Sequence, residues 1–180
     1  MTQHSHKNQL YEALGQIVVS FNLLERGIDG LILACMESMP AHGRILLTNM
    51  PFPQKVSAMD ELIRNSHSEQ ELGLLHYTLG ALVERVLTCR QQRDDWMQSY
   101  WVPEIEHAPG VVMRLQRSVD EIELVLKPVN IVQLENFIVL LNATIAYLCG
   151  FHQKLANNFK RIQDVQVPGL LLKTPRSISD

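Results

Sequence analysis

The chain has 180 residues, of which 46% are hydrophobic and only 19% are charged. This length suits one domain of ordinary size that buries its core without disulfides or metal. The composition excludes intrinsic disorder, which needs low hydrophobicity and high net charge. It also indicates more apolar surface than a monomer hides. Because the net charge is −3, contact with nucleic acid would have to be local.

Cysteine usage and hydropathy predict a soluble, cytoplasmic protein without membrane contact. Cys35, Cys89 and Cys149 form no Cys-x-x-Cys pair, so they indicate buried free thiols in a reducing compartment. The first residues lack the basic and apolar regions of a secretory signal. Two strongly apolar stretches, 17–36 and 137–151, are interrupted by polar residues or shorter than the roughly 20 residues of a membrane span.

The first half of the chain predicts two helices. Apolar residues recur at steps of three and four over residues 8–39, which is typical of a long amphipathic helix. Pro40 would end this helix, and Gly43 would lie in a connector. A shorter helix is expected over residues 53–65.

A third helix should run from Ser66 or Ser68, either of which can cap it, to about residue 92. The segments 111–119 and 121–126 alternate between apolar and polar residues, which favours a small β-hairpin, although a helix over 111–126 remains an alternative.

The last long helix is predicted over residues 131–160 by a regular apolar stripe. We therefore expect a mainly α fold: an up-and-down bundle of about four long helices with a small β-hairpin insertion before the last helix. One helical domain would cover residues 1–160. The C-terminal tail, 161–180, would be either docked or frayed.

The segment 90–101 concentrates charged and aromatic side chains at the end of the third predicted helix. It holds two arginines, two aspartates and three aromatic residues. A phosphodiester-cleaving site would pair an arginine with an imidazole within one helical turn. No histidine lies within a turn of Arg93, so the alternative interpretation is structural: the aromatic residues wedge the helix end, and Arg93 pairs with a carboxylate.

Three segments together resemble the bacterial relatives of HEPN (higher eukaryote and prokaryote nucleotide-binding) domains. The first is 17–25, which carries an aromatic residue followed four residues later by Glu25. The second is 51–56, which opens the second predicted helix. The third is 93–101, where the family shows an arginine, usually an asparagine, then a histidine followed by serine and an aromatic residue. The resemblance covers roughly residues 10–101.

The chain departs from the family at two positions of the third segment. Asp94 stands where asparagine is common, and Gln98 stands in place of the histidine. The resemblance implies metal-independent RNA cleavage in active members, with arginine and histidine of two subunits meeting at a dimer interface. Because glutamine is no acid or base near neutral pH, we expect a scaffold that keeps the dimer and a phosphate-binding Arg93 but lacks catalysis.

Other histidines are weaker candidates for the missing group. Arg64 and His67 are closer in sequence than the arginine and histidine of the family motif, so we interpret them as part of a polar turn. His107 lies in a proline-rich loop and could swing back toward Arg93. His152 lies on the apolar stripe of the last helix, which is more typical of a hydrogen-bonded core residue.

Glu25 borders the buried face of the first predicted helix, where a carboxylate needs a partner. Arg93 or Arg90 is the expected partner if the first and third helices are neighbours. The same pairing would suit a structural role or an inherited site. We expect Glu25→Gln to lower the melting temperature.

The leading hypothesis is a catalytically silent HEPN-like binding or regulatory homodimer whose partner is RNA, a nucleotide or a protein. The resemblance implies a defence or toxin–antitoxin setting. One alternative is a metal-independent endoribonuclease using Arg93 with His107 or Tyr100, and another is a protein-interaction module. No cofactor or metal ion is expected. The candidate catalytic residues are Arg93, Gln98 and His107, and the candidate binding residues are Arg90, Arg93, Asp94, Gln98, Tyr100, Trp101 and Glu25.

Overall fold

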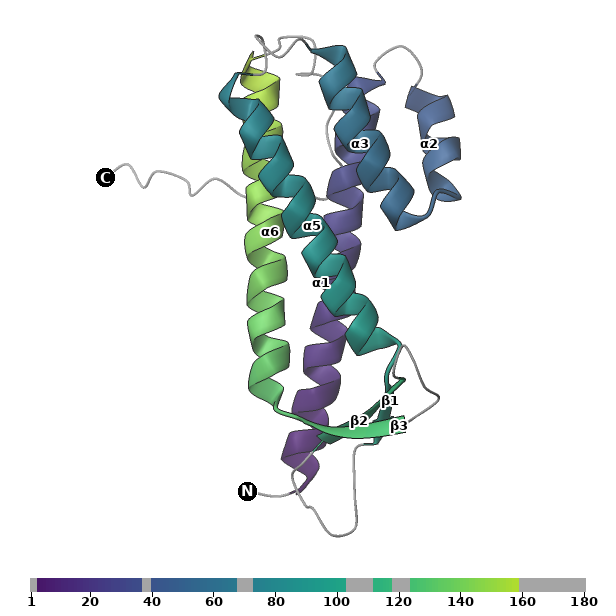
Figure 1. Ribbon diagram of the computed structural model, residues 1–180, viewed down its shortest axis with the longest axis vertical. Coiled ribbons are helices and arrows are strands. Elements are labelled where there is room, and N and C mark those ends of the chain that lie inside the picture. The colour runs from purple at the N-terminus through teal and green to yellow at the C-terminus, as the bar shows by residue number, and fades with distance from the viewer. Residues whose placement is uncertain (1–2, 37–39, 68–72, 103–111, 118–123, 159–180) are drawn as a thin grey trace, which may run out of the picture. The chain divides into compact units, whose positions relative to one another are not determined.

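The computed structural model describes residues 3–36, 40–67, 73–102, 112–117 and 124–158, and it is mainly helical (Figure 1). The described helices are α1 (Gln3–Cys35), α2 (Pro40–Thr48), α3 (Phe52–Ser66), α5 (Leu74–Met97) and α6 (Ile131–Asn158). The strands are β1 (Tyr100–Val102), β2 (Val112–Arg117) and β3 (Leu124–Val129). The expectation of a mainly α chain is confirmed, but the described residues alone contain five helices rather than four.

The chain divides into two compact units. Unit 1 comprises Met1–Leu24 and Leu82–Ile145, and unit 2 comprises Glu25–Ala81 and Ala146–Asp180. Unit 1 therefore holds the first part of α1, most of α5, the strands and the first part of α6. Unit 2 holds α2 and α3 together with the remaining parts of α1, α5 and α6. The predicted tail, 161–180, lies outside the described residues.

The core of unit 1 is built from helix faces with apolar residues at steps of three and four, which places them on one side of each helix. Its fully buried residues include Leu10, Ile17, Leu24, Leu82, Val86, Leu134 and Leu141. Two polar groups join this core: the Cys89 sulfur lies 3.4 Å from the Thr144 hydroxyl, and both residues are fully buried. Burial raises the pKa of the Cys89 thiol, and the hydrogen bond to Thr144 opposes this only in part.

The strands of unit 1 form one antiparallel sheet in the order β1-β2-β3. Trp101 of β1 pairs with Arg114 of β2, and Arg114 pairs with Lys127 of β3. β1 follows almost directly on α5, so the sheet continues from the end of that helix (Figure 1). The sequence predicted two strands here, whereas the backbone pairs three. The expected turn near residues 118–120 lies outside the described residues.

A connector was expected after residue 39, but Pro40–Thr48 form helix α2 in unit 2. Pro40 begins α2, a position where the absent N–H costs no hydrogen bond and the fixed φ suits a helix. Gly43 lies close to α1: a Cβ at this position would lie 2.8 Å from Leu33 Cδ2, so that side chain would have to shift. Proline and glycine usually disfavour helices, but here Pro40 begins α2 and Gly43 lies where α2 contacts α1.

The predicted start of the third helix was also wrong. Ser66 is the last residue of α3, and α5 begins only at Leu74. Gly73, which directly precedes α5, has a φ of 45°. This left-handed conformation suits glycine because it has no Cβ to clash. The capping role expected of Ser68 lies outside the described residues.

Candidate functional site

The candidate site at the end of α5 is organised around Asp94. Its carboxylate accepts a hydrogen bond from Arg93 Nη1 at 2.9 Å and lies 3.4 Å from Arg90 Nε. The side chain of Arg90 is 40% exposed and that of Arg93 is 43% exposed. Both guanidinium groups therefore share one carboxylate while keeping much of their surface in contact with solvent.

Phe21 of α1 lies beneath the second of these arginines. The Arg93 guanidinium carbon is 5.0 Å from the centre of the Phe21 ring, a cation–π distance. Phe21 itself is only 4% exposed, so its position is fixed by the core of unit 1. The contact joins the aromatic residue of the first sequence segment to the arginine of the third, and it orients the guanidinium from below.

Two indole rings follow the arginines. The ring centres of Trp96 and Trp101 are 5.9 Å apart and the ring planes differ by 25°, which is a stacked arrangement. Trp101 Nε1 donates a hydrogen bond to the Trp96 carbonyl at 3.0 Å and thereby fixes the pair where α5 gives way to β1. Of these two, only Trp101 was among the binding residues predicted from the sequence. Tyr100 lies between them in sequence and pairs with Leu115 through the sheet.

Gln98 is exposed just beyond the last turn of α5, and its backbone N–H donates to the Asp94 carbonyl at 2.9 Å. Its side-chain amide offers hydrogen bonds but no proton transfer near neutral pH. His107, the predicted substitute, lies outside the described residues. No histidine therefore accompanies Arg93 in the described part of this site.

Glu25 has a different partner from the one expected. Lys55 Nζ of α3 donates hydrogen bonds to Glu25 Oε1 at 2.8 Å and to Asp29 Oδ2 at 3.0 Å. The prediction that Arg90 or Arg93 pairs with Glu25 was wrong, because the α1 segment that carries Glu25 packs against α3 within unit 2. Lys55 belongs to the second segment of the family resemblance, but nothing in the sequence marked it as buried.

The Lys55 cluster, meaning Lys55 with Glu25 and Asp29, is an inward-facing ion group. The Lys55 side chain is only 6% exposed, and its carboxylate partners are 32% and 27% exposed. Burial alone would lower the pKa of Lys55, but its hydrogen bonds to both carboxylates outweigh this and raise the pKa. Burial raises the pKa of Asp29, and the hydrogen bond from Lys55 offsets only part of that effect. The lysine therefore stays charged and joins α1 to α3.

An arginine–histidine contact that was not expected from the sequence joins the last turn of α3 to the first turn of α5. Arg64 pairs with Asp60 at 2.9 Å, and its Nη1 lies 3.1 Å from the His76 ring nitrogens. His67, the histidine of the predicted polar turn, instead places Nδ1 3.2 Å from the Ile63 carbonyl. Arg64 is thus held by its own helix and by His76, which agrees with a structural role for Arg64.

His152 has no hydrogen bond to its Nε2 within the described residues. Burial lowers the pKa of its imidazole. The expected core hydrogen bond is therefore missing at this atom. Among the described residues there is no group of three or more His, Cys, Asp or Glu side chains placed to hold a metal ion.

Comparison with protein-family models, curated proteins and solved structures gives no match for this chain. The resemblance to HEPN domains therefore stays a prediction. By length and composition alone, one described helix, Ile131–Asn157, could cross a membrane. Core helices of soluble proteins pass the same test, so this finding weighs little.

Proposed function

We propose that the chain is a catalytically silent HEPN-like binding protein that recognises single-stranded RNA at the end of α5. In this proposal the scaffold is a soluble, cytoplasmic homodimer of helical bundles, each with a β-hairpin insertion before α6. The defence or toxin–antitoxin setting belongs to the same proposal, through the family resemblance alone.

The observation that carries the proposal is the pair of half-exposed arginines oriented by Asp94. Guanidinium groups bind phosphate through paired N–H donors, and a group held in place loses less conformational freedom on binding. Arg93 is held from two sides, by Asp94 at 2.9 Å and by the Phe21 ring at 5.0 Å. Arg90 and Arg93 therefore outnumber the one carboxylate, Asp94, with which both are paired.

The stacked indoles favour single-stranded nucleic acid as the ligand. Proteins that bind single strands combine cationic side chains along the backbone with aromatic faces on which bases stack. Trp96 and Trp101 lie on the same stretch of chain as Arg93, and both are partly exposed. A nucleotide whose phosphate meets Arg93 would find an aromatic surface within a few residues.

Gln98 supports a silent site rather than a nuclease. Cleavage of RNA without metal needs a group that takes and returns protons, and the glutamine amide does neither. Its exposure leaves it able to donate and accept hydrogen bonds with a bound base or ribose.

The homodimer is supported by apolar side chains that α1 exposes within unit 1. Tyr11 is 52% exposed, Val18 45% and Val19 59%. Nothing lies within 4 Å of the position that a Cβ on Gly15 would occupy, so this surface is also open at its middle. Exposed apolar groups of this kind are typical of contact surfaces between proteins.

Intrinsic fluorescence tests RNA binding directly, because Trp96 and Trp101 are the only two tryptophans of the chain. We expect a single-stranded RNA oligomer to quench this emission. Replacing both Arg90 and Arg93 by alanine should weaken binding by about tenfold and reduce the salt dependence by one to two phosphate contacts. Arg85→Ala, an exposed arginine on the same helix, is the matched control and should leave both unchanged.

Two results would contradict the proposal. If the RNA neither quenches the tryptophans nor binds in fluorescence anisotropy at low salt, the chain is not an RNA-binding protein, and a protein-interaction module becomes the better hypothesis. If the protein cleaves RNA in the presence of EDTA and Arg93→Ala abolishes cleavage, the site is catalytic and the silent interpretation is wrong.

A further inference from the structure

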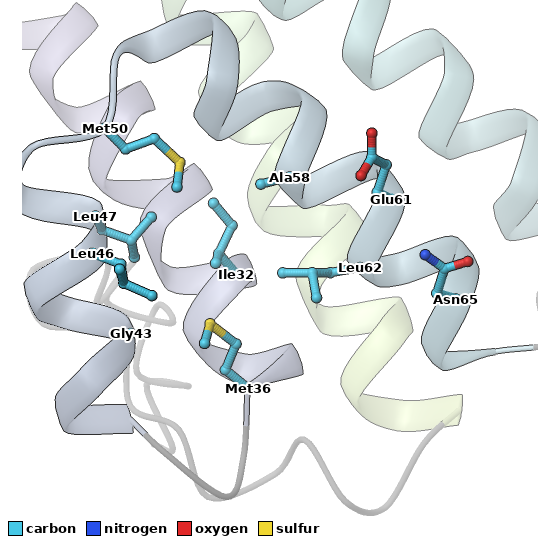
Figure 2. A pocket seen from close by; sticks show the side chains of 10 residues that line it. All are labelled: Ile32, Met36, Gly43, Leu46, Leu47, Met50, Ala58, Glu61, Leu62 and Asn65. Carbon is cyan, nitrogen blue, oxygen red and sulfur yellow. The ribbon is translucent and has the colours of Figure 1, made fainter.

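An apolar pocket lies within unit 2, between the end of α1 and the helices α2 and α3 (Figure 2). Its volume is about 310 Å³. Leu46 and Leu47 come from α2, Ile32 from α1, and Ala58 and Leu62 from α3, while Met36 and Met50 lie just after α1 and α2. The pocket is separate from the arginine site, which belongs to unit 1, and nothing proposed above uses it.

One side of the pocket is fixed and the other is open. Ile32 and Leu47 are 2% and 4% exposed, so they belong to the core. Gly43 also lines the pocket and lies close to α1: a Cβ here would lie 2.8 Å from Leu33 Cδ2. Leu46, by contrast, lines the pocket and is 59% exposed. This leucine leaves an apolar wall facing solvent, which costs free energy unless something covers it.

The polar groups of the pocket come from α3, and the one charged group among them, Glu61, is negative. Glu61 and Asn65 line it one turn apart, and both are exposed. Within the residues that the structure describes, Glu61 takes part in no ion pair. The chemistry of the lining therefore selects a short aliphatic segment that carries a cation beside it.

We propose that this pocket binds residues 167–173 of the same chain. This segment reads Val-Pro-Gly-Leu-Leu-Leu-Lys, which offers three leucines to the apolar wall and Lys173 to Glu61. It lies outside the described residues, and the last described helix, α6, ends at Asn158. The leucines match the apolar residues of the lining, and the positive charge of Lys173 matches the negative charge of Glu61.

Eight residues, 159–166, connect the end of α6 to this segment. Residues 159–166 can extend over at most roughly 30 Å. The C-terminal end of α6 and the end of α1 lie toward the same end of unit 2 (Figures 1 and 2). A tether of this length gives an effective concentration on the order of millimolar. Even weak apolar contacts then favour the segment of the same chain over a free ligand.

Hydrogen exchange of the full chain, followed by mass spectrometry, tests this proposal from the pocket side. Leu46→Asp should speed the exchange of the 167–173 segment by about tenfold, because a charged wall repels leucines. Ile45→Asp is the matched control: it adds the same charge on the same helix at a residue that is 68% exposed and does not line the pocket. It should leave the exchange of the segment unchanged.

The tail side gives the reciprocal measurement. Replacing Leu170, Leu171 and Leu172 by aspartate should speed exchange in α2, whereas three aspartates at 177–179 should not. Glu61→Lys and Lys173→Glu should each weaken protection, and the double variant should restore it.

Three outcomes would overturn the proposal. The first is a segment that exchanges at the rate of an unstructured peptide in the unaltered chain. The second is equal acceleration by Leu46→Asp and Ile45→Asp. The third is protection that disappears on dilution together with a dimer, which would assign the pocket to the tail of a second copy. Failure of any of these tests would leave the RNA proposal untouched, because that site lies in unit 1.

Discussion

Two charged clusters among the described residues use cations in opposite ways. In unit 2, Lys55 is 6% exposed and lies between two carboxylates at 2.8 and 3.0 Å. In unit 1, Arg90 and Arg93 are 40% and 43% exposed and share the single carboxylate of Asp94. The first cluster has more negative than positive groups, and the second has more positive than negative groups.

This difference separates a structural ion group from a binding site. A buried cation must be satisfied by its own chain, and removing one partner leaves an uncompensated charge. Exposed ion pairs contribute little to stability because water solvates both groups, so their donors remain available to a ligand. The number of carboxylates per cation, together with the exposed fraction of the cationic side chains, therefore indicates which cluster can bind phosphate.

The largest expected effect is on the buried cluster. Lys55→Ala should lower the free energy of unfolding by about 2–4 kcal/mol, because it leaves Glu25 and Asp29 without their common partner. Thermal unfolding followed by circular dichroism measures this. Lys154→Ala, at an exposed lysine, is the control. A loss equal to that of the control would mean that the Lys55 cluster is solvated and that the comparison fails.

The two carboxylates of the cluster should differ from each other. Glu25→Gln should cost about 1 kcal/mol, since it removes a charged acceptor 2.8 Å from Lys55. Asp29→Asn should cost less, because burial already raises the pKa of Asp29 and disfavours its charge. Chemical denaturation of both variants gives the order. The reverse order would show that Asp29 is the main partner of Lys55.

The free energy of unfolding should fall toward both acid and alkaline pH, giving an acid limb and an alkaline limb in its pH profile. Burial lowers the pKa of His152, so the unfolded chain binds a proton first and stability falls as pH drops below about 6.5. The raised pKa of Lys55 acts in the opposite direction: its stabilisation is complete below its ordinary pKa and is lost as pH rises through the folded-state value. Burial also raises the pKa of the Cys89 and Cys149 thiols, which adds to the alkaline loss. Denaturation curves from pH 5 to 11 measure both limbs. His152→Gln should flatten the acid limb alone, and an unchanged acid limb would contradict this assignment.

The smallest effect on stability is expected at the exposed cluster. Asp94→Asn should change the free energy of unfolding by less than about 0.5 kcal/mol. It should nevertheless strengthen RNA binding by about two- to fivefold, because a competing anion is removed from both arginines. Asp95→Asn, which alters the neighbouring aspartate, is the control in the same anisotropy titration. Weaker binding by Asp94→Asn would mean that orienting the arginines matters more than freeing them.

The sequence predicted helices well where periodicity alone determines them. Helix α6 begins at the expected residue 131, and α3 covers Phe52–Ser66 against an expected 53–65. It failed at α2 because Pro40 and Gly43 have a weak intrinsic preference for helix. Their suitability depends on position and on contact with α1, which a local pattern does not contain.

The candidate sites show the same limit. Arg93 and Asp94 are neighbours in sequence, so their pairing with each other could be predicted from the chain alone. The partner of Glu25 is 30 residues away, and only the packing of α1 against α3 reveals that Lys55 is buried. The Arg64–His76 contact likewise depends on how α5 returns beside α3.

The hydrogen-bonded pair of Cys89 and Thr144 has a consequence for chemical labelling. Thiols react as thiolates, and burial both raises the pKa of Cys89 and keeps alkylating reagents away from it. Cys35 and Cys149 are partly exposed and belong to unit 2. The rate at which Cys89 is alkylated therefore measures how often α5 and α6 separate within unit 1. The Cys89 thiol is thus a native probe of the opening rate of that core.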